Sequence, residues 1–378
     1  MRLRLLEGIE TVEAAAWDAL VPADDPFVRH AFLSLLERSG SAAPRTGWQP
    51  LHALLEDASG RALAAAPLYA KSHSWGEYVF DHGWAEAYER AGGSYYPKLQ
   101  LAVPFTPVPG PRLLARGAPA PVVDGLVEGL LEIARKTRVS SLHVTFCGRD
   151  EAALLASHGF LERRGVQYHW HNRGYRDFQD FLDALRSSKK KMIRKEREAV
   201  RGSGIEVQAL SGDAVTPGLL AGFHEFYLAT IDKRWGNAYL TAAFFEGLWA
   251  MREHLVYVVA RERGRVVAGA LNLLSGGTLY GRLWGSTEEH RFLHFECCYY
   301  AAIELAIARN LARVEAGAQG QHKLQRGYEP VLTHSTHWIA DPGLGRAVAR
   351  FLSQERRHME LQLAELRALL PYRREEPA

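Results

Sequence analysis

The residues best suited to chemistry gather in the stretch from Tyr280 to Tyr328. An apolar strand is predicted to end near Trp284, and an almost wholly apolar helix is predicted over residues 295–310. A second strand, over residues 312–317, then opens into a polar loop that contains glycine. Open α/β sheets bind their ligands where strand ends and helix starts bring polar groups together. This stretch is therefore predicted to hold a binding or catalytic site.

Glu296 is the first candidate for a general base in this stretch. It lies at the predicted start of the helix, where the helix dipole favours a carboxylate, and it is expected to face Trp284. A capping or dipole role explains the same position equally well. Glu304 lies two turns further along the apolar helix and is interpreted as structural, because a buried carboxylate needs a cation. The candidate partners of Glu304 are Lys323, Arg326 and Arg282.

The loop after the second strand supplies the other candidate catalytic groups, His322 and Lys323. Lys323 and Arg326 are three residues apart and could together hold a phosphate or a carboxylate. The glycines beside them allow the backbone to come close to a ligand. A solvated turn is the alternative interpretation. The candidate substrate contacts of the whole stretch are Arg282, Trp284, His294, Gln319 and Arg326.

A metal site is a rival use of the same residues. His290 and His294 are four residues apart and Glu296 follows, which is a spacing of metal ligands if the turn is helical. The order of a metalloprotease motif is missing, because Arg291 follows His290 where a glutamate is required. A metal-dependent hydrolase is therefore the less favoured alternative. The main interpretation needs no metal and no tightly bound cofactor.

A second group of ionisable residues lies in the first half of the chain. Four of them fall within eleven residues, among the aromatic residues Trp75, Tyr78 and Trp84. So many ionisable groups among aromatic rings favour a pocket wall, although a salt-bridged insertion is a fair alternative. The candidate substrate contacts in this region are Lys71, His73, Glu77, Asp81, Tyr96 and Lys98, with Tyr95 beside them.

The overall composition is that of a soluble globular protein. The chain has 378 residues, of which 47% are apolar and 24% are charged, and the net charge is +3. Two domains are expected at this length. The first residues break their apolar run at Glu7 and Glu10, and no run of about 18 apolar residues exists. We therefore expect no secretory signal, no membrane span and a cytoplasmic location, with the three cysteines reduced.

The sequence also contains a weak internal duplication. Residues 51–66 match residues 255–270, with Gly60 and Gly264 aligned at an offset of 204. The Gly159-Phe160 and His169-Trp170 pairs match Gly327-Tyr328 and His337-Trp338 at an offset of 168. The first half therefore carries 36 extra residues, and its irregular segment 71–98 is the candidate insertion. Each copy is predicted to run hairpin, strand, helix, strand, short helix, strand.

These patterns predict four parts of the chain. Residues 1–176 form a first domain with its insertion at about 71–98, and residues 177–204 form a basic connecting helix. Residues 205–345 form a second domain, and residues 346–378 form a C-terminal helix. The residues before position 40 are expected to be helical.

The order of elements in each copy is that of the GNAT acyltransferase fold. Four longer blocks make the resemblance more specific: KSHSWGEYVFDHGWAEAYERAGG, YYPKLQLAVPFTPVPGPRLL, HFECCYYAAIELAIARN and GAQGQHKLQRGYEP. They resemble the FemAB-like predicted N-acyltransferases of bacteria, which are related to the Fem-type aminoacyl transferases. The resemblance implies an α/β fold with mixed sheets, built as two tandem GNAT (acyl-CoA N-acyltransferase-like) domains. It also implies a transferase that moves an acyl or aminoacyl group to an amine of a small molecule or peptide.

The resemblance leaves two donors open, acyl-CoA and aminoacyl-tRNA. The sequence PVPGPR stands where GNAT enzymes carry a glycine-rich pyrophosphate loop, so Gly110 and Arg112 are candidate cofactor contacts. The usual pyrophosphate motif is nevertheless absent after the central strand of both copies. This absence disfavours standard acetyl-CoA binding and leaves room for aminoacyl-tRNA as the co-substrate.

The connecting segment bears on that choice. Residues 186–201 contain eight cations and two glutamates, a net charge of +6 in sixteen residues. This density is sufficient for a tRNA or polyphosphate footprint, although a solvated helix face is the simpler interpretation. A catalytically inactive, duplicated GNAT scaffold that binds RNA or a peptide is the alternative that is not an enzyme.

Overall fold

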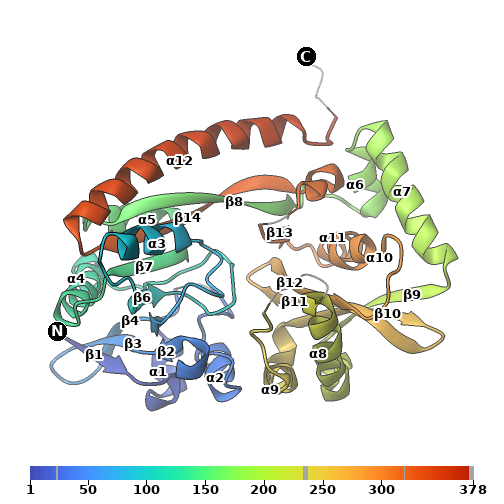
Figure 1. Cartoon of the computed structure of the whole chain (residues 1–378). Helices are drawn as coiled ribbons and strands as arrows, with labels where there is room; N and C mark the ends of the chain where they lie inside the picture. The colour runs from blue at the N-terminus through green and yellow to red at the C-terminus, as the bar shows by residue number, and fades with distance from the viewer. Residues whose placement is uncertain (23, 233–236, 319, 374–378) are drawn as a thin grey trace. The chain divides into compact units, whose positions relative to one another are not determined.

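The computed structural model describes residues 1–22, 24–232, 237–318 and 320–373. The chain forms two compact units (Figure 1). Unit 1 comprises Met1–Gly165 and Leu332–Glu360, and unit 2 comprises Val166–Val331 and Leu361–Ala378. Both are α/β units with mixed sheets, as the sequence predicts.

Unit 1 contains two sheets. The smaller one has the strand order β1(Arg2–Leu6)-β3(His52–Glu56)-β4(Ala62–Ala66), and all of its strands are antiparallel. In the larger one the order is β2(Trp48–Pro50)-β5(Leu68–Lys71)-β6(Lys98–Leu101)-β7(Ser141–Cys147)-β14(Glu329–Ile339). The strands β6 and β7 are parallel, whereas β14 runs antiparallel to β7.

The larger sheet of unit 1 has one apolar and one polar face. Side chains alternate along a strand, so Leu99 and Leu142 point to the face that helix α4 (Ala120–Lys136) covers with Leu126 and Leu130. The opposite face carries polar side chains that are also buried. These side chains are Tyr69, Lys71, Lys98, Gln100, Ser141, His143 and Thr145.

The other helices of unit 1 follow the predicted elements with two exceptions. The segment before residue 7, expected to be helical, is strand β1, which pairs with β3. The irregular insertion contains a helix, α3 (His82–Arg90), which the sequence pattern did not predict. The remaining short helices are η1 (Ile9–Thr11), α1 (Ala14–Asp18), α2 (His30–Arg38), η2 (Pro44–Thr46) and α5 (Arg149–Ser157).

The described residues of unit 2 form a mixed sheet. Its strand order is β8(Leu161–His171)-β13(Arg313–Glu315)-β12(Thr278–Ser286)-β11(Arg265–Ser275)-β10(Leu255–Glu262)-β9(Ile205–Ser211). The strands β12 and β13 are parallel, and the others pair antiparallel. The long apolar helix predicted after β12 begins as α10 (Leu293–Phe295), continues through a π-helical turn, η5 (Glu296–Tyr300), and ends as α11 (Ala301–Ala308).

The predicted connecting helix of unit 2 is two helices, α6 (Phe178–Asp183) and α7 (Ser187–Gly202). The pattern of apolar residues is shared by both, so periodicity alone did not separate them. The other helices are η3 (Gly212–Ala214), α8 (Pro217–Asp232), α9 (Ala242–Gly247), η4 (Leu248–His254) and η6 (Gln321–Arg326).

The duplication is visible in the last strand of each copy. The strands β8 and β14 are both eleven residues long, and they start and end 168 residues apart, at the predicted offset. β8 belongs to the first copy along the chain, yet it pairs with β13 of unit 2. β14 belongs to the second copy, yet it pairs with β7 of unit 1. Each copy therefore supplies the final strand of the other copy's sheet, and the compact units are discontinuous in sequence.

The last helix, α12 (Pro342–Ala368), starts within unit 1 and ends within unit 2. Among the described residues, no helix has the length and the apolar character needed to cross a membrane.

Candidate functional site

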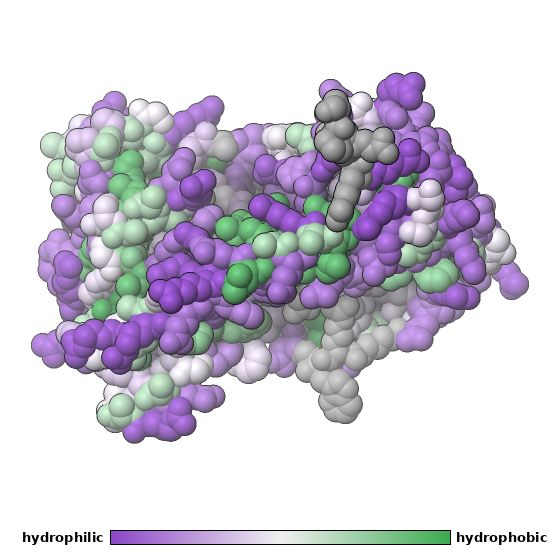
Figure 2. All heavy atoms as spheres, turned by 90° about the horizontal axis from the view of Figure 1, so that it is seen from above, coloured by the Kyte–Doolittle hydropathy of each residue, from purple (hydrophilic) through white to green (hydrophobic). Residues whose placement is uncertain are grey.

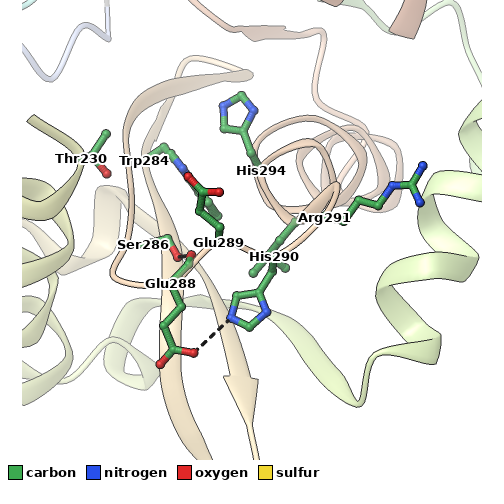
Figure 3. Close-up of a pocket in the computed structure, with 9 residues that line it drawn as sticks. Thr230, Trp284, Ser286, Glu288, Glu289, His290, Arg291 and His294 are labelled. Atoms are coloured by element: carbon green, nitrogen blue, oxygen red, sulfur yellow. Dashed lines mark hydrogen bonds and ion pairs between the residues drawn. The ribbon is translucent and has the colours of Figure 1, made fainter. Parts of the chain in front are cut away.

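Unit 2 contains a pocket where β12 ends and α10 begins. Its volume is about 510 Å³, and it opens beside the turn that joins the two elements (Figure 3). The predicted contacts Trp284 and His294 both line it. The other lining residues are Thr230, Ser286, Glu288, Glu289, His290, Arg291 and Leu293. The sequence prediction of a site at this strand end thus coincides with a real concavity.

The turn itself explains how the pocket is shaped. Phe292 has a left-handed backbone, with φ of 65°, and its carbonyl accepts the first helical hydrogen bonds, from the N–H groups of Phe295 and Glu296. Glu288 accepts a hydrogen bond from Arg265 at 2.7 Å and lies 3.8 Å from His290. The arginine holds the pKa of the Glu288 carboxyl below its usual value. Figure 3 shows Glu289 pointing towards Trp284, and Arg291 pointing away from both glutamates.

Histidine and tyrosine rings continue from the pocket into the unit. The ring of His294 packs edge-on against Trp284 and Tyr299, and its centroid lies 6.1 Å from that of His322. His322 Nε2 lies 3.0 Å from the Tyr299 hydroxyl. Burial and the neighbouring Arg326 and Lys323 lower the pKa of His322, so its ring is neutral near pH 7. The structure therefore brings the predicted residues Trp284, His294 and His322 together.

Glu296, the predicted base, is turned to a different partner. Its side chain is buried, and both carboxylate oxygens accept hydrogen bonds from Arg197 at 2.8–3.1 Å. Burial raises the pKa of Glu296, and the arginine opposes that shift. Arg197 also donates to Glu304 at 2.7 Å, so the partner of Glu304 is not one of the three cations predicted for it. Glu296 does not line the pocket, and its hydrogen bonds with Arg197 favour a structural part for it.

The predicted anion clamp of Lys323 and Arg326 is also used internally. Lys323 is buried, and its ammonium donates to the carbonyls of Ala316 and Gly317. Arg326 is 4% exposed and donates to Glu196 and to the carbonyl of His322. Both cations are therefore committed to holding the loop, which corrects the expectation that they bind a phosphate together.

Two predicted residues of this stretch remain, Arg282 and Gln319. Arg282 is half-buried on β12 and does not line the pocket. Gln319 lies outside the described residues. The metal alternative is not supported either, because Arg197 takes up the oxygens of Glu296. In the described part of the chain, no group of three His, Cys, Asp or Glu side chains is placed to hold a metal ion.

In unit 1 the predicted cluster is brought together and buried. The ammonium of Lys98, fully buried, donates to Asp81 at 2.5 Å, to Glu77 at 2.7 Å and to Ser74 at 2.8 Å. Ser74 also contacts the hydroxyl of Tyr96 at 2.8 Å. Asp81 also accepts from the Tyr95 hydroxyl at 2.7 Å. The salt-bridged insertion that was the alternative interpretation describes this arrangement better than an open pocket wall.

The second lysine of this cluster has an unusual environment. Lys71 is fully buried, lies 3.6 Å from the centre of the Trp48 ring and 4.0 Å from Glu77. Burial lowers the pKa of Lys71 to about 7, and burial raises the pKa of Glu77 to about 7. His73, by contrast, is half-buried and accepts a hydrogen bond from the backbone of Trp75. It does not share the Lys98 network.

The PVPGPR loop of unit 1 is closed by its own contacts. Arg112 is 1% exposed, and its guanidinium donates to the carbonyls of Thr145, Val108 and Pro111. The backbone N–H groups of Arg112 and Leu113 donate to the Glu151 carboxylate. A Cβ at Gly110 would lie 2.2 Å from Asp25, so the glycine serves close packing. The geometry thus does not support Gly110 and Arg112 as phosphate contacts.

Comparison with known proteins places this architecture in a family. The family model described as peptidoglycan biosynthesis/recognition, FemAB-like, matches residues 8–374. The chain belongs to the FemAB-like family. No curated protein sequence matches it. With family and fold together, an acyl or aminoacyl transferase is the supported class of activity.

Solved structures share the FemAB-like fold at low sequence identity. FemX has a TM-score of 0.55 at 11% identity, with 92% of this chain and 100% of FemX covered. The C-terminal domain of a putative lysylphosphatidylglycerol synthetase from Agrobacterium fabrum has a TM-score of 0.56 at 9% identity, covering 90% of this chain and 95% of that one. L-PGS from Bacillus licheniformis has a TM-score of 0.52 at 10% identity, covering 88% and 98%.

The basic helix of this FemAB-like chain has two different faces. Its inner face buries Glu196 and Arg197, which removes one charge of each sign from the surface. Seven cations of residues 186–201 stay exposed or half-buried beside Glu198, a net charge of 7 − 1 = +6. Two of them already have partners, because Lys190 pairs with Asp183 and Arg186 donates to the carbonyls of Leu370 and Pro371. Figure 2 shows hydrophilic side chains over this part of unit 2. The seven cations are Arg186, Lys189, Lys190, Lys191, Arg194, Lys195 and Arg201.

Several residues of interest were missed at the sequence level. Glu196 and Arg197 were counted only as charges of a helix, although two adjacent opposite charges at an apolar stripe signal a buried pair. Glu288 and Glu289 line the pocket but were not predicted as site residues, whereas the neighbouring His290 and His294 were named as candidates. His143 and His337, whose Nδ1 atoms lie 2.6 Å apart, sit on strands far apart in sequence, so no local signal could join them.

Proposed function

We propose that this FemAB-like protein is an N-acyltransferase that moves an acyl or aminoacyl group from an activated donor to a primary amine. The observation that carries the proposal is the pocket at the end of β12, in which two carboxylates and two histidines surround a space large enough for a small side chain. Family membership supports the class of reaction. The description of the family also makes an amine of a peptidoglycan precursor the first acceptor to test.

The acceptor amine would bind in the pocket as an ammonium ion. Glu288 and Glu289 supply the negative charge that attracts it, and Glu289 points towards Trp284, whose ring offers a cation–π contact. An ammonium is not a nucleophile, so a proton must leave before it attacks. His294 lines the pocket and is the proposed proton acceptor. The neutral ring of His322 packs beside the ring of His294.

The reaction then needs only alignment and polarisation of the donor carbonyl. The amine nitrogen attacks the carbonyl carbon, a C–N bond forms, and the bond from carbon to the ester oxygen or thioester sulfur breaks. The nitrogen gives up two protons in all: the ammonium proton passes through His294 to solvent before the attack, and the second passes to His294 and then to the leaving alkoxide or thiolate. No redox step or metal ion is required for this balance.

The charges favour aminoacyl-tRNA over acyl-CoA as the donor. After β12, where a GNAT enzyme binds pyrophosphate, this chain presents Glu288 and Glu289, which repel an anion. In unit 1 the equivalent loop donates its N–H groups to Glu151. The outer face of α7, by contrast, offers the charge density that binds RNA phosphates. An aminoacyl-tRNA donor would place the reaction in the cytoplasm.

The test is amide formation with each donor in turn. The purified chain is mixed with a primary-amine peptide of a peptidoglycan precursor and with either aminoacyl-tRNA or acyl-CoA, and products are identified by mass spectrometry. We expect transfer from aminoacyl-tRNA and its loss in Glu289→Gln. Transfer from acyl-CoA alone would overturn the choice of donor. Wild-type rates in both Glu289→Gln and His294→Ala would overturn the site.

A further inference from the structure

The buried face of α7 carries two adjacent residues of opposite charge, Glu196 and Arg197, which are 6% and 9% exposed. Each reaches a partner on a different element. Arg197 holds Glu296, the first residue of the π-helical turn, and Glu196 holds Arg326, the last residue of η6. Two consecutive residues of one helix therefore hold η6, which carries His322, and the π-helical turn that directly follows α10, which carries His294.

The contact made by Arg197 fixes the start of the pocket helix. Its Nε and Nη2 atoms donate to both oxygens of Glu296, and Nη2 also donates to Glu304 at 2.7 Å. The guanidinium stacks on the Phe178 ring, 4.5 Å from its centre. A planar fork held at this many points leaves the helix no freedom to rotate. His294, two residues before Glu296, is positioned by the same constraint.

The contact made by Glu196 fixes the loop of His322. Arg326 donates to Glu196 at 2.7 and 2.9 Å, and the Tyr300 hydroxyl donates to the same carboxylate. Both of these bonds to Glu196 come from Nη2 of Arg326, whereas Nη1 donates to the carbonyl of His322 at 2.8 Å and Nε donates to the Tyr300 hydroxyl at 2.9 Å. The guanidinium lies 3.5 Å from the centre of the Phe295 ring. Glu196 is thus connected to the backbone of His322 through a single residue, Arg326.

Buried pairs of this kind are a poor way to gain stability, because the loss of hydration offsets the attraction, and apolar residues would pack as well. They are a good way to hold a geometry. The other face of the same helix is the cationic surface that fits phosphates. We propose that Glu196 and Arg197 are positioning residues that couple a polyanionic donor on the outer face of α7 to His294 and His322. The coupling to a donor rests on the proposed function, whereas the positioning does not.

The charges around His322 predict the direction in which its pKa changes when one of them is removed. Arg326 and Lys323 from its own loop face it, together with Glu196 of α7, Tyr299 of the π-helical turn and the ring of His294. The two cations lower the pKa of His322, and Glu196 raises it. Removing the charge of Glu196 should therefore lower that pKa further, and removing the charge of Arg326 should raise it.

Nuclear magnetic resonance of ¹³C-labelled histidine tests the positioning without any activity assay. We expect Glu196→Gln to lower the pKa of His322, because the negative charge that raises it is removed. We expect Arg197→Gln to move the His294 signal, and Arg197→Lys, which keeps the charge but not the fork, to move it less. Glu198→Gln, on the exposed side of the same helix, should change neither signal. Unchanged histidine titrations in both Glu196→Gln and Arg197→Gln would overturn the inference.

Circular dichroism decides whether each variant is folded. If Arg197→Gln is unfolded, Arg197→Lys and Glu304→Gln are measured in its place. The side chain of Glu304 is half exposed, and its replacement removes a single contact with Arg197. A folded Arg197→Lys protein with an unchanged His294 signal would then overturn the inference.

A short RNA duplex serves as the probe of coupling. In the wild-type protein, saturating RNA should move the His294 and His322 signals. Arg197→Gln or its folded substitute should bind the duplex within about threefold of wild type, because its outer cations are intact, but lose the response of the histidines. A full response in that variant would overturn the coupling. Failure of the wild-type protein to bind RNA would overturn the choice of donor, while the histidine titrations would still decide the positioning.

Discussion

Unit 1 surrounds Lys98 with Glu77 and Asp81, and unit 2 surrounds Arg197 with Glu296 and Glu304. Both are one cation between two carboxylates. Lys98 and its partners are all buried, and they belong to the insertion of residues 71–98 itself. Arg197 lies on a helix whose other face is open to solvent, and the side chain of Glu304 is half exposed. The two clusters show that buried charges with shifted pKa values do not by themselves locate a site, whereas the pocket beside Trp284 and His294 in unit 2 is a direct structural observation.

The largest expected effect is on the stability of unit 1. Lys98→Met removes the cation that the buried carboxylates of Glu77 and Asp81 share and leaves only Lys71, 4.0 Å from Glu77, so it should lower the free energy of unfolding by about 3–5 kcal/mol. Urea unfolding followed by circular dichroism measures it. Lys136→Met, which removes an exposed pair with Glu132 on α4, is the control and should change the free energy of unfolding very little. Equal effects of the two variants would mean that the Lys98 cluster is not a closed structural core.

The next effect is on catalysis in unit 2. His294→Ala should lower kcat by about 10²- to 10⁴-fold, the range of a lost general base, because His294 lines the pocket. The free energy of unfolding should change much less than in Lys98→Met. His358→Ala, an exposed histidine of α12, is the matched control. An undiminished kcat in His294→Ala would remove the contrast between a structural unit 1 cluster and a catalytic unit 2 pocket.

A third effect is the dependence of stability on pH through Lys71. The folded protein holds the pKa of Lys71 at about 7, below its unfolded value of 10.5, so the unfolded chain binds more protons between these values. Stability should therefore rise with pH above 7, by at most about 1.4 kcal/mol per pH unit from this group. Lys71→Met should remove that rise. Urea unfolding of both proteins from pH 7 to 9 gives the two slopes, and identical slopes would contradict the burial argument.

The smallest effect is on the surface of α7. Replacing Lys191, Lys195 and Arg201 by glutamine should weaken RNA binding and reduce the slope of log Kd against log salt by about 2 to 3. Lys136→Gln on α4 is the control. Filter binding over a range of salt concentrations measures both. A slope that stays at the wild-type value would show that α7 is an ordinary solvated helix.

Local pattern predicted most elements, because each rests on a short-range period. The two hairpins, helix α4 and the strands β8 and β14 lie where alternation and helical spacing placed them. Helix α3 was missed because its aromatic and charged residues show no clean period. Strand β1 was missed although Arg2-Leu3-Arg4-Leu5 alternates polar and apolar residues, and Leu3 and Leu5 pack against the core of unit 1.

The candidate site was predicted only in part. The position of a strand end and the types of Trp284, His294 and His322 are sequence properties, and the structure brings these three together. The ion-pair partners of Glu296 and Arg326 could not be predicted from the sequence. Arg197, the partner of Glu296, and Glu196, the partner of Arg326, lie about 100 or more residues away along the chain. The sequence pattern of a carboxylate at a helix start is the same whether the side chain faces a pocket or an arginine.

By itself, the sequence determined the duplicated α/β order, the family and the net charge of the connecting helix, since these follow from local period, composition and motif. The tertiary structure alone decided which charged side chains are buried in ion pairs. It exchanged the last strands of the two copies, buried Lys98 and Arg197 against carboxylates, and left Glu289 and His294 facing a pocket. The physical reason is that an ion pair depends on distance in space and on exclusion of water, and neither is encoded in the spacing of residues along the chain.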